Sequence, residues 1–509
     1  MTKTRTQNSL LNSKVSLLYY VLILAATFIS RKVFIDCLGS EVLGLNTTVS
    51  NLLGLLNLSE LGIGVAVSFA LYRPLFDDDR KSIIEIVSVQ GWLYKNIAIV
   101  VSVGGMIMMA LFPWIFAKSE LPLWYAYSTF SVLLFSSLLG YFVNYKQIIL
   151  TADQKQYKVV LVTKTLTFVK LIAQILLIRY SAWGYQGWLV LEFVFSIFIA
   201  WGLDYVVRRT YPWLKTSFRL GKAVHKAHSV IITKTKQLFF HQVSAYILFQ
   251  TSPLVIYAYT DLTLVAIYGN YMLISSGIVS LLESVFSGIV PGVGNLIAEG
   301  KREAIQRVFN EYFACRMLVA GIVCYCLWVG GDAFVTMWVG KEFLLAPIPF
   351  ALVVAITFVN TTRVSAGFTS AYGLFKDIWA PITEACLNLG LSVLLGYYWG
   401  LTGILIGVLI SLLLIVVTWK PYFLHREGLQ LPVWPYFLKY IGYLAVLFGS
   451  VWLVRTALGP IEDVNVFGWL LGVLKHLVGY GLLAYVILVL FDRGMRDFSG
   501  RVLRMLKLK

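Results

Sequence analysis

Charged side chains occur inside long apolar runs of this sequence. Glu60 is near the middle of one such run, and Arg31, Lys170 and Arg363 lie in three others. A charge at the centre of a membrane helix costs about 2.5–3.5 kcal/mol on insertion scales, so we expect each to have a partner or a function. A carboxylate such as Glu60 suits proton or ion coupling, because it can change its charge.

Uncharged polar residues recur at helical spacing in the same runs. The second run shows this pattern most clearly, because its polar and small residues fall within about 40° of one line on a helix. These residues are Asn46, Ser50, Asn57, Glu60, Gly64 and Ser68. Such stripes indicate either a hydrated cavity or small-residue packing with hydrogen bonds between helices. On the first reading, Ser50 and Asn57 would line such a cavity, as would Asn360 and Arg363, which lie at helical spacing in the tenth run.

Two further intramembrane carboxylates, Glu283 and Glu384, are weaker candidates for coupling or for lining a cavity. Structural ion pairing explains them equally well, as it does the cations Lys164, Arg316 and Lys475. Arg31 also has a second interpretation, because a residue near the outer end of a span can extend its head group to the membrane surface.

The sequence offers no catalytic or metal-binding pattern. The five cysteines have no CxxC spacing, and the five histidines form no HxxxH pair. The segment from Gly294 to Arg302 fails as a phosphate loop because no Ser or Thr follows Lys301. We therefore expect no enzyme activity and no cofactor. A proton gradient, a sodium gradient and the membrane potential stay open as energy sources.

Long apolar segments must position these residues. The chain has 509 residues, of which 59% are hydrophobic and 13% charged, and its mean hydropathy is +0.79. A soluble protein is about a quarter charged, so a bilayer must be the solvent here. We predict an all-α integral membrane protein of about fourteen transmembrane helices, each needing about 20 apolar residues. The predicted spans are 15–35, 43–72, 86–116, 122–145, 159–180, 186–206, 238–258, 264–294, 313–335, 347–371, 378–398, 401–419, 437–457 and 467–491.

The distribution of cations predicts the orientation. Most Lys and Arg residues outside the spans fall in segments that share one side of the membrane with the N-terminus. Cations concentrate in cytoplasmic loops, so both termini are expected in the cytoplasm. The net charge of +17 then reflects orientation and contact with membrane lipids, and it does not indicate nucleic-acid binding.

Weak internal similarity predicts two lobes. Trp183-Gly184 is matched by Trp399-Gly400, and Gly54, Leu58 and Glu60 are matched by Gly277, Leu281 and Glu283. Six spans per lobe give both lobes the same orientation, as in transporters with a midplane site. We predict an N-lobe over 1–206, a basic linker over 207–237, a C-lobe over 238–420, and two further helices with a basic tail over 421–509.

Several stretches resemble a known family. They are the segment from Leu38 to Asn46, LNLSELGIGVAVSFALYRPL at 56–75, GNLIAEGK at 294–301 and GLFKDIWAPITEACLNLGLS at 373–392. In these, the chain resembles Wzx-type polysaccharide (O-antigen or capsule) flippases of the multidrug/oligosaccharidyl-lipid/polysaccharide exporter superfamily. The resemblance implies alternating access, a bacterial inner membrane, and a substrate of undecaprenyl-pyrophosphate-linked oligosaccharide moved from the cytoplasmic to the outer leaflet. It also implies polysaccharide-assembly proteins as partners. With such a substrate, the cations Arg31, Lys170 and Arg363 would bind the pyrophosphate. The side chains of Ser50, Asn57 and Asn360 would meet sugar hydroxyls.

Two other functions stay open. A multidrug or small-cation antiporter of the same fold would favour an acidic, aromatic cavity, which the mid-membrane arginine argues against. A membrane-embedded sugar polymerase or glycosyltransferase would place its reactive residues in sizeable loops, and the predicted outer loops are short. The sequence identifies neither the glycan nor the coupling ion.

Overall fold

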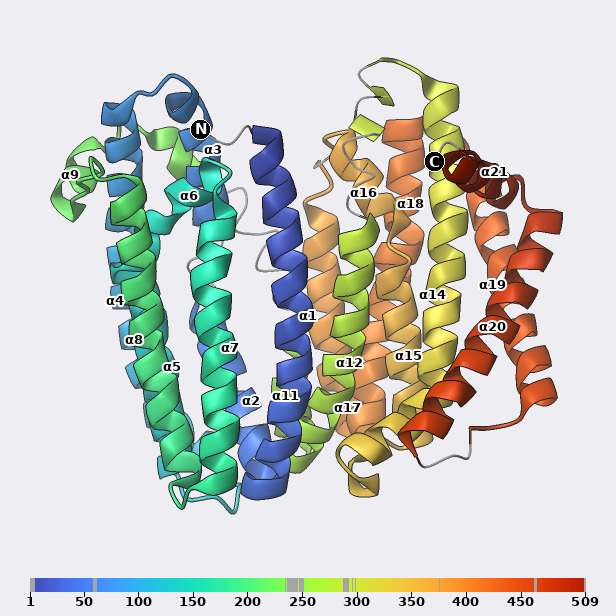
Figure 1. Ribbon diagram of the computed structural model, residues 1–509, viewed down its shortest axis with the longest axis horizontal. Helices are drawn as coiled ribbons and strands as arrows, with labels where there is room; N and C mark the ends of the chain where they lie inside the picture. The colour runs from blue at the N-terminus through green and yellow to red at the C-terminus, as the bar shows by residue number, and fades with distance from the viewer. Residues whose placement is uncertain are drawn as a thin grey trace. The chain divides into compact units, whose positions relative to one another are not determined.

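The computed structural model describes residues 5–57, 62–233, 235, 246, 251–286, 293–294, 296–297, 299–374, 376–461 and 465–507. Every regular element among these residues is a helix, which confirms the all-α prediction (Figure 1). The chain forms two compact units, Met1–Ala266 and Ile267–Lys509. This division does not test the predicted lobe and linker boundaries, which stay predictions.

Within the described residues, nine helices are long and apolar enough to cross a membrane, and a bent pair adds a tenth candidate. The bent pair consists of Trp124–Phe142 and Asn144–Ala152, with 58° between their axes. Each of the fourteen predicted spans overlaps at least one described helix. The protein is therefore an all-α, multi-pass membrane protein.

In unit 1, long helices run side by side around a core of apolar residues (Figure 1). Its helices are α1 (Arg5–Leu38), α2 (Ser40–Leu56), α3 (Ile63–Phe76), α4 (Arg80–Ile115), α5 (Trp124–Phe142), α6 (Ile148–Ala152), α7 (Gln156–Tyr180), α8 (Gly184–Thr210), α9 (Phe218–Val224) and α11 (Ser252–Tyr259). Helix α7 packs along both α1 and α8, which brings the polar faces of the three together.

The second predicted span is not one continuous helix. Helix α2 ends at Leu56 with Asn57 as its C-cap, and α3 begins at Ile63 after Gly62, whose φ of 93° is left-handed. Such a backbone conformation is inexpensive only for glycine and interrupts the helical phase. The prediction of a single polar line from Asn46 to Ser68 is therefore wrong, because that line requires an unbroken helix.

Unit 2 is built around α14 (Arg302–Trp338), which packs against α15, α19, α20 and α21. Its other helices are α12 (Leu262–Phe286, which begins in unit 1), α15 (Pro347–Thr361), α16 (Val364–Ala371), α17 (Trp379–Leu412), α18 (Lys420–Phe423), α19 (Trp434–Leu458), α20 (Val466–Phe491) and α21 (Arg493–Lys507). The predicted tenth span is also interrupted, because Arg363 separates α15 from α16 with a non-helical ψ of 60°.

Helix α17 contains the reversal expected between the eleventh and twelfth spans. Gly400 has φ 53° and ψ −135°, so the helix breaks there. The helical segments before and after the break pack tightly against each other, since Ser392 Oγ donates to the carbonyl of Ile404 at 3.1 Å. A Cβ on Gly407 would lie only 2.6 Å from the backbone nitrogen of Ser392. The Trp399-Gly400 motif therefore forms the turn of a helical hairpin.

Candidate substrate site

A polar cavity of about 670 Å³ lies within unit 1. Helices α1, α2, α7 and α8 supply most of its lining, together with Leu133 of α5 and Tyr246. Three of the six predicted ligand-binding residues line it, namely Arg31, Ser50 and Lys170. Their side chains come from three different helices, so the packing of α1 and α7 described above is what brings them together.

Lys170 is held by a carboxylate that the sequence analysis did not select. Lys170 Nζ lies 2.6 Å from Glu192 Oε1, and Gln174 Nε2 donates to Glu192 Oε2 at 3.0 Å. Both charged side chains are 15% exposed. The signal that could have revealed Glu192 is its position as a carboxylate in the middle of the predicted sixth span, the same signal that selected Lys170.

Arg31 is positioned well inside helix α1. The helix continues for seven residues beyond it to Leu38, and Arg31 donates a hydrogen bond of 3.0 Å to the carbonyl of Ala266. An arginine extending to the membrane surface would point away from the protein. The lining position therefore favours the cavity interpretation of Arg31 over the surface interpretation.

The charges that line this cavity leave one net cation. The charged side chains of its lining are Arg31, Lys170 and Glu192, which together carry one net positive charge. Hydroxyl and amide groups of Thr27, Ser30 and Asn51 complete the polar wall. The arrangement offers one positive charge and many hydrogen-bonding groups to a ligand, which suits an anionic, hydroxyl-rich molecule.

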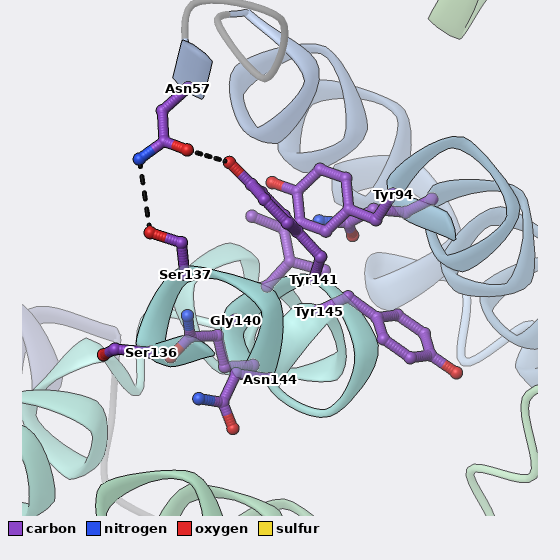
Figure 2. A pocket seen from close by; sticks show the side chains of 11 residues that line it. Asn57, Tyr94, Ser136, Ser137, Gly140, Tyr141, Asn144 and Tyr145 are labelled. Atoms are coloured by element: carbon purple, nitrogen blue, oxygen red, sulfur yellow. Dashed lines mark hydrogen bonds between the residues drawn. The ribbon is translucent and has the colours of Figure 1, made fainter. Parts of the chain in front are cut away.

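Asn57 lies in a different, smaller pocket of unit 1. This pocket has a volume of about 240 Å³ and is lined from α2, α4, α5 and the short 3₁₀ turn Asn144–Gln147. Figure 2 shows Asn57 between Tyr141, whose hydroxyl donates to Oδ1 at 2.9 Å, and Ser137, whose hydroxyl accepts from Nδ2 at 3.3 Å. The structure thus separates Asn57 from Ser50, although the sequence had placed them on one line.

Asn360 and Arg363 are neighbours in unit 2. Asn360 Oδ1 accepts two hydrogen bonds from the Arg363 guanidinium, at 3.1 Å from Nε and 2.8 Å from an Nη atom. The guanidinium also lies 3.9 Å from Glu384 Oε1, and Glu384 is 4% exposed. These contacts hold the Arg363 side chain in place at the break between α15 and α16. Ion pairing with Glu384 therefore accounts for much of its position.

Glu283 forms an ion pair with Arg316, a buried residue that also donates from Nε to the carbonyl of Thr361 at 2.6 Å. The Arg316 guanidinium lies over the rings of Phe286 and Tyr312. This packing favours the ion-pairing interpretation of Glu283. Glu60, the predicted coupling carboxylate, lies outside the described residues. In the described part of the chain, no group of three His, Cys, Asp or Glu side chains could hold a metal ion.

Comparisons with known proteins find similarity at the level of structure. The structure is similar to that of the lipid II flippase MurJ in an inward closed conformation, with a TM-score of 0.68 and 13% identity over 94% of this chain and 99% of that one. It is also similar to an inward-facing multidrug resistance MATE family transporter of the MOP superfamily, with a TM-score of 0.60 and 14% identity over 82% and 99% of the two chains.

No protein-family model matches the sequence, and no curated protein matches it. At such low identity the structural similarity establishes the fold and nothing finer. The chain therefore has the fold of a MurJ-like or MATE-like membrane transporter. The fold does not determine the substrate, which depends instead on the residues that line the cavity.

Proposed function

We propose that this protein is a transporter that flips undecaprenyl-pyrophosphate-linked oligosaccharide units from the cytoplasmic to the outer leaflet of a bacterial inner membrane. The observation that carries the proposal is the cavity of unit 1, where Arg31 and Lys170 lie among hydroxyl and amide groups. The structural neighbour MurJ is a lipid II flippase, which supports a flippase function for this protein. The wider proposal includes alternating access, coupling to an ion gradient or the membrane potential, and contact with polysaccharide-assembly proteins.

Arg31 is the residue expected to bind the pyrophosphate. A guanidinium presents paired donors to phosphate oxygens. Lys170 would also bind the phosphate, because an incoming phosphate competes with Glu192 for the ammonium group of Lys170. Serine, threonine and amide groups of the wall would then meet sugar hydroxyls, while the polyprenyl chain stays in lipid.

The decisive experiment is a flipping assay in proteoliposomes. Purified protein is reconstituted with undecaprenyl-pyrophosphate-linked oligosaccharide, and the glycan that becomes accessible to an external glycosidase is measured over time. We expect wild-type protein to expose the glycan and Arg31→Gln to slow this about 10- to 100-fold, because a charge-assisted hydrogen bond contributes ~1.5–3 kcal/mol. Wild-type protein that flips no such lipid would refute the proposal.

Arg179→Gln is the matched control for Arg31→Gln. Arg179 belongs to α7, is exposed, and does not line the cavity. The same chemical change at that position should leave the flipping rate unchanged. Equal loss of flipping in both variants would show that general damage, and not the cavity cation, is responsible.

A multidrug or small-cation antiporter is the second candidate. Glu192 gives the cavity a carboxylate, and the MATE neighbour is a multidrug resistance transporter. The two functions differ in the charge of the substrate. Uptake of an organic cation such as ethidium into the same proteoliposomes, lost in Glu192→Gln but retained in Arg31→Gln, would favour the antiporter.

A further inference from the structure

The smaller pocket of unit 1 differs from the cavity in its chemistry. All of its lining residues are uncharged at neutral pH, and three of them are tyrosines, Tyr94, Tyr141 and Tyr145. The remaining side chains are amides, serine hydroxyls and one isoleucine. A pyrophosphate would find no cation here, and a polyprenyl chain would find few apolar groups. The pocket therefore suits a neutral ligand that forms many hydrogen bonds.

Three amide oxygens at this pocket have no hydrogen-bond partner among the residues that the structure describes. They are Gln90 Oε1, Asn144 Oδ1 and Gln147 Oε1, and all three are shielded from solvent. Gln90 is only 2% exposed. Buried polar atoms of folded proteins are nearly always satisfied, so an unpaired group at the wall of a cavity indicates an occupant that hydrogen-bonds to it. Gln90 belongs to α4, whereas Asn144 and Gln147 belong to the 3₁₀ turn, so two elements bring these amides to the pocket.

The elements around the pocket explain why these amides meet there. The 58° bend between α5 and the segment Asn144–Ala152 places the amides of the turn beside α4, which carries Gln90 and Tyr94. The hydroxyl of Tyr145 is hydrogen-bonded to Thr216 Oγ1 at 2.7 Å, and the rings of Tyr94 and Tyr141 meet edge to face with centroids 5.5 Å apart. Figure 2 shows the labelled residues gathered around one space.

The size of the pocket limits what can occupy it. Its volume of about 240 Å³ would hold roughly eight water molecules at ~30 Å³ each. Fewer waters than that would be enough to form hydrogen bonds with the three unpaired oxygens. It lies below the ~300–1,000 Å³ of sites for drug-sized ligands. A single sugar ring fits between these limits. Sugar hydroxyls both donate and accept, as the amides and serines here do, whereas a metal cation would use the acceptors only.

We infer that this pocket binds one uncharged sugar ring, as a subsite distinct from the cavity that contains Arg31 and Lys170. The choice of a sugar rests on the proposed function, in which the substrate carries a glycan. Ile148, the first residue of α6, lines the pocket. Helices α6 and α3 lie at the same end of unit 1 (Figure 1), the end predicted to face the cytoplasm. A substrate loaded from the cytoplasm would present its sugars at this end.

The test measures binding of free sugars to the purified full-length protein. N-acetylglucosamine, galactose and rhamnose are each titrated while the thermal unfolding midpoint is recorded, since a ligand that binds only the folded state raises it. At least one of them is expected to raise the midpoint of wild-type protein. The variant Gln90→Leu should weaken that sugar about tenfold or more, because it removes a hydrogen-bonding partner.

The stability of Gln90→Leu without ligand separates a binding role from a structural one. Replacing an unsatisfied buried amide by an apolar side chain of similar size should leave the unfolding midpoint unchanged or raise it. A lower midpoint would show that Gln90 supports the fold, and Asn144→Leu would then decide whether sugar binding depends on the pocket. Gln186→Leu, at an exposed position of α8, is the matched control and should bind sugar as wild type does.

Inorganic pyrophosphate, titrated in parallel, distinguishes failure of this inference from failure of the proposed function. We expect its binding to be lost in Arg31→Gln and retained in Gln90→Leu. Flipping and pyrophosphate binding with no response to any sugar would overturn the sugar subsite alone. A sugar response that survives both Gln90→Leu and Asn144→Leu would also overturn it. Sugar binding that depends on Gln90, in a protein that flips no lipid-linked glycan, would leave the subsite standing and reject the proposed function.

Discussion

At the scale of single residues, the predicted ligand-binding residue Lys170 forms an ion pair with Glu192, which the sequence pattern did not identify. Lys170 is a candidate from the sequence because placing a cation within a membrane span costs free energy. The structure shows the offsetting group, a carboxylate from α8 at 2.6 Å, with Gln174 bonded to its second oxygen. A paired charge in a cavity can serve stability, transport or both, so the two contributions have to be separated by experiment.

Two variants separate the contribution of this pair to stability from its contribution to transport. The first breaks the pair, and the second removes both charges. We expect Glu192→Leu to destabilise the protein by on the order of 2 kcal/mol, less than the ~3–5 kcal/mol of a fully buried pair, because water reaches the cavity. The double variant Lys170→Met/Glu192→Leu should recover most of that loss, since no unpaired charge remains. Unfolding in detergent measures the stability, and the flipping assay measures function. If the double variant transports at the wild-type rate, the pair has no role in transport.

At the scale of elements, breaks in the helices decide where polar residues lie. Asn57 lies after the end of α2, and Arg363 lies between α15 and α16. Both positions look like mid-span residues when the sequence is read as uninterrupted apolar runs. A helix that ends inside the bilayer leaves backbone groups without intrahelical partners, so such breaks are tolerated where the backbone is buried in protein or borders water.

The hairpin at Trp399-Gly400 gives a test at this scale. A Cβ on Gly403 would collide with the carbonyl oxygen of Leu395, whereas one on Gly390 would meet nothing within 4 Å. We expect Gly403→Ala to destabilise the fold by about 1–3 kcal/mol through overpacking. Gly390→Ala is the control and should be neutral or stabilising by up to ~1 kcal/mol, because alanine favours helix. Equal unfolding midpoints for the two variants would contradict the tight packing of the hairpin.

At the scale of the whole molecule, the distribution of cations predicts the orientation of the protein in the membrane. The loop before α4 and the loop between α7 and α8 should lie on opposite sides, with the first in the cytoplasm. Both loops belong to unit 1, so the prediction is independent of how the two units are arranged.

Labelling of single cysteines can test that orientation. The five native cysteines are first replaced, and Lys81→Cys and Ser181→Cys, both at exposed positions, are introduced one at a time. A thiol reagent that cannot cross the membrane should label Ser181→Cys in intact cells and Lys81→Cys only after the membrane is opened. The reverse pattern would place both termini outside and would reverse the proposed direction of flipping.

The sequence by itself determined the class of fold and the approximate position of the spans. Hydropathy is a property of consecutive residues, so it can be read without knowledge of tertiary contacts. It also pointed to Arg31, Lys170 and Ser50 as polar residues in apolar surroundings. These properties are local, and each needs only the residue and its neighbours along the chain.

Only the tertiary structure decided which of these residues share a site. The pairing of Lys170 with Glu192 depends on the packing of α7 against α8. Asn57 and Ser50 line different pockets because different helices pack beside each of them. The neutral pocket likewise forms only because a bend in the chain after α5 places amides of the 3₁₀ turn beside Gln90. Contacts between helices depend on how their surfaces pack, and the spacing of residues along one helix does not contain that information.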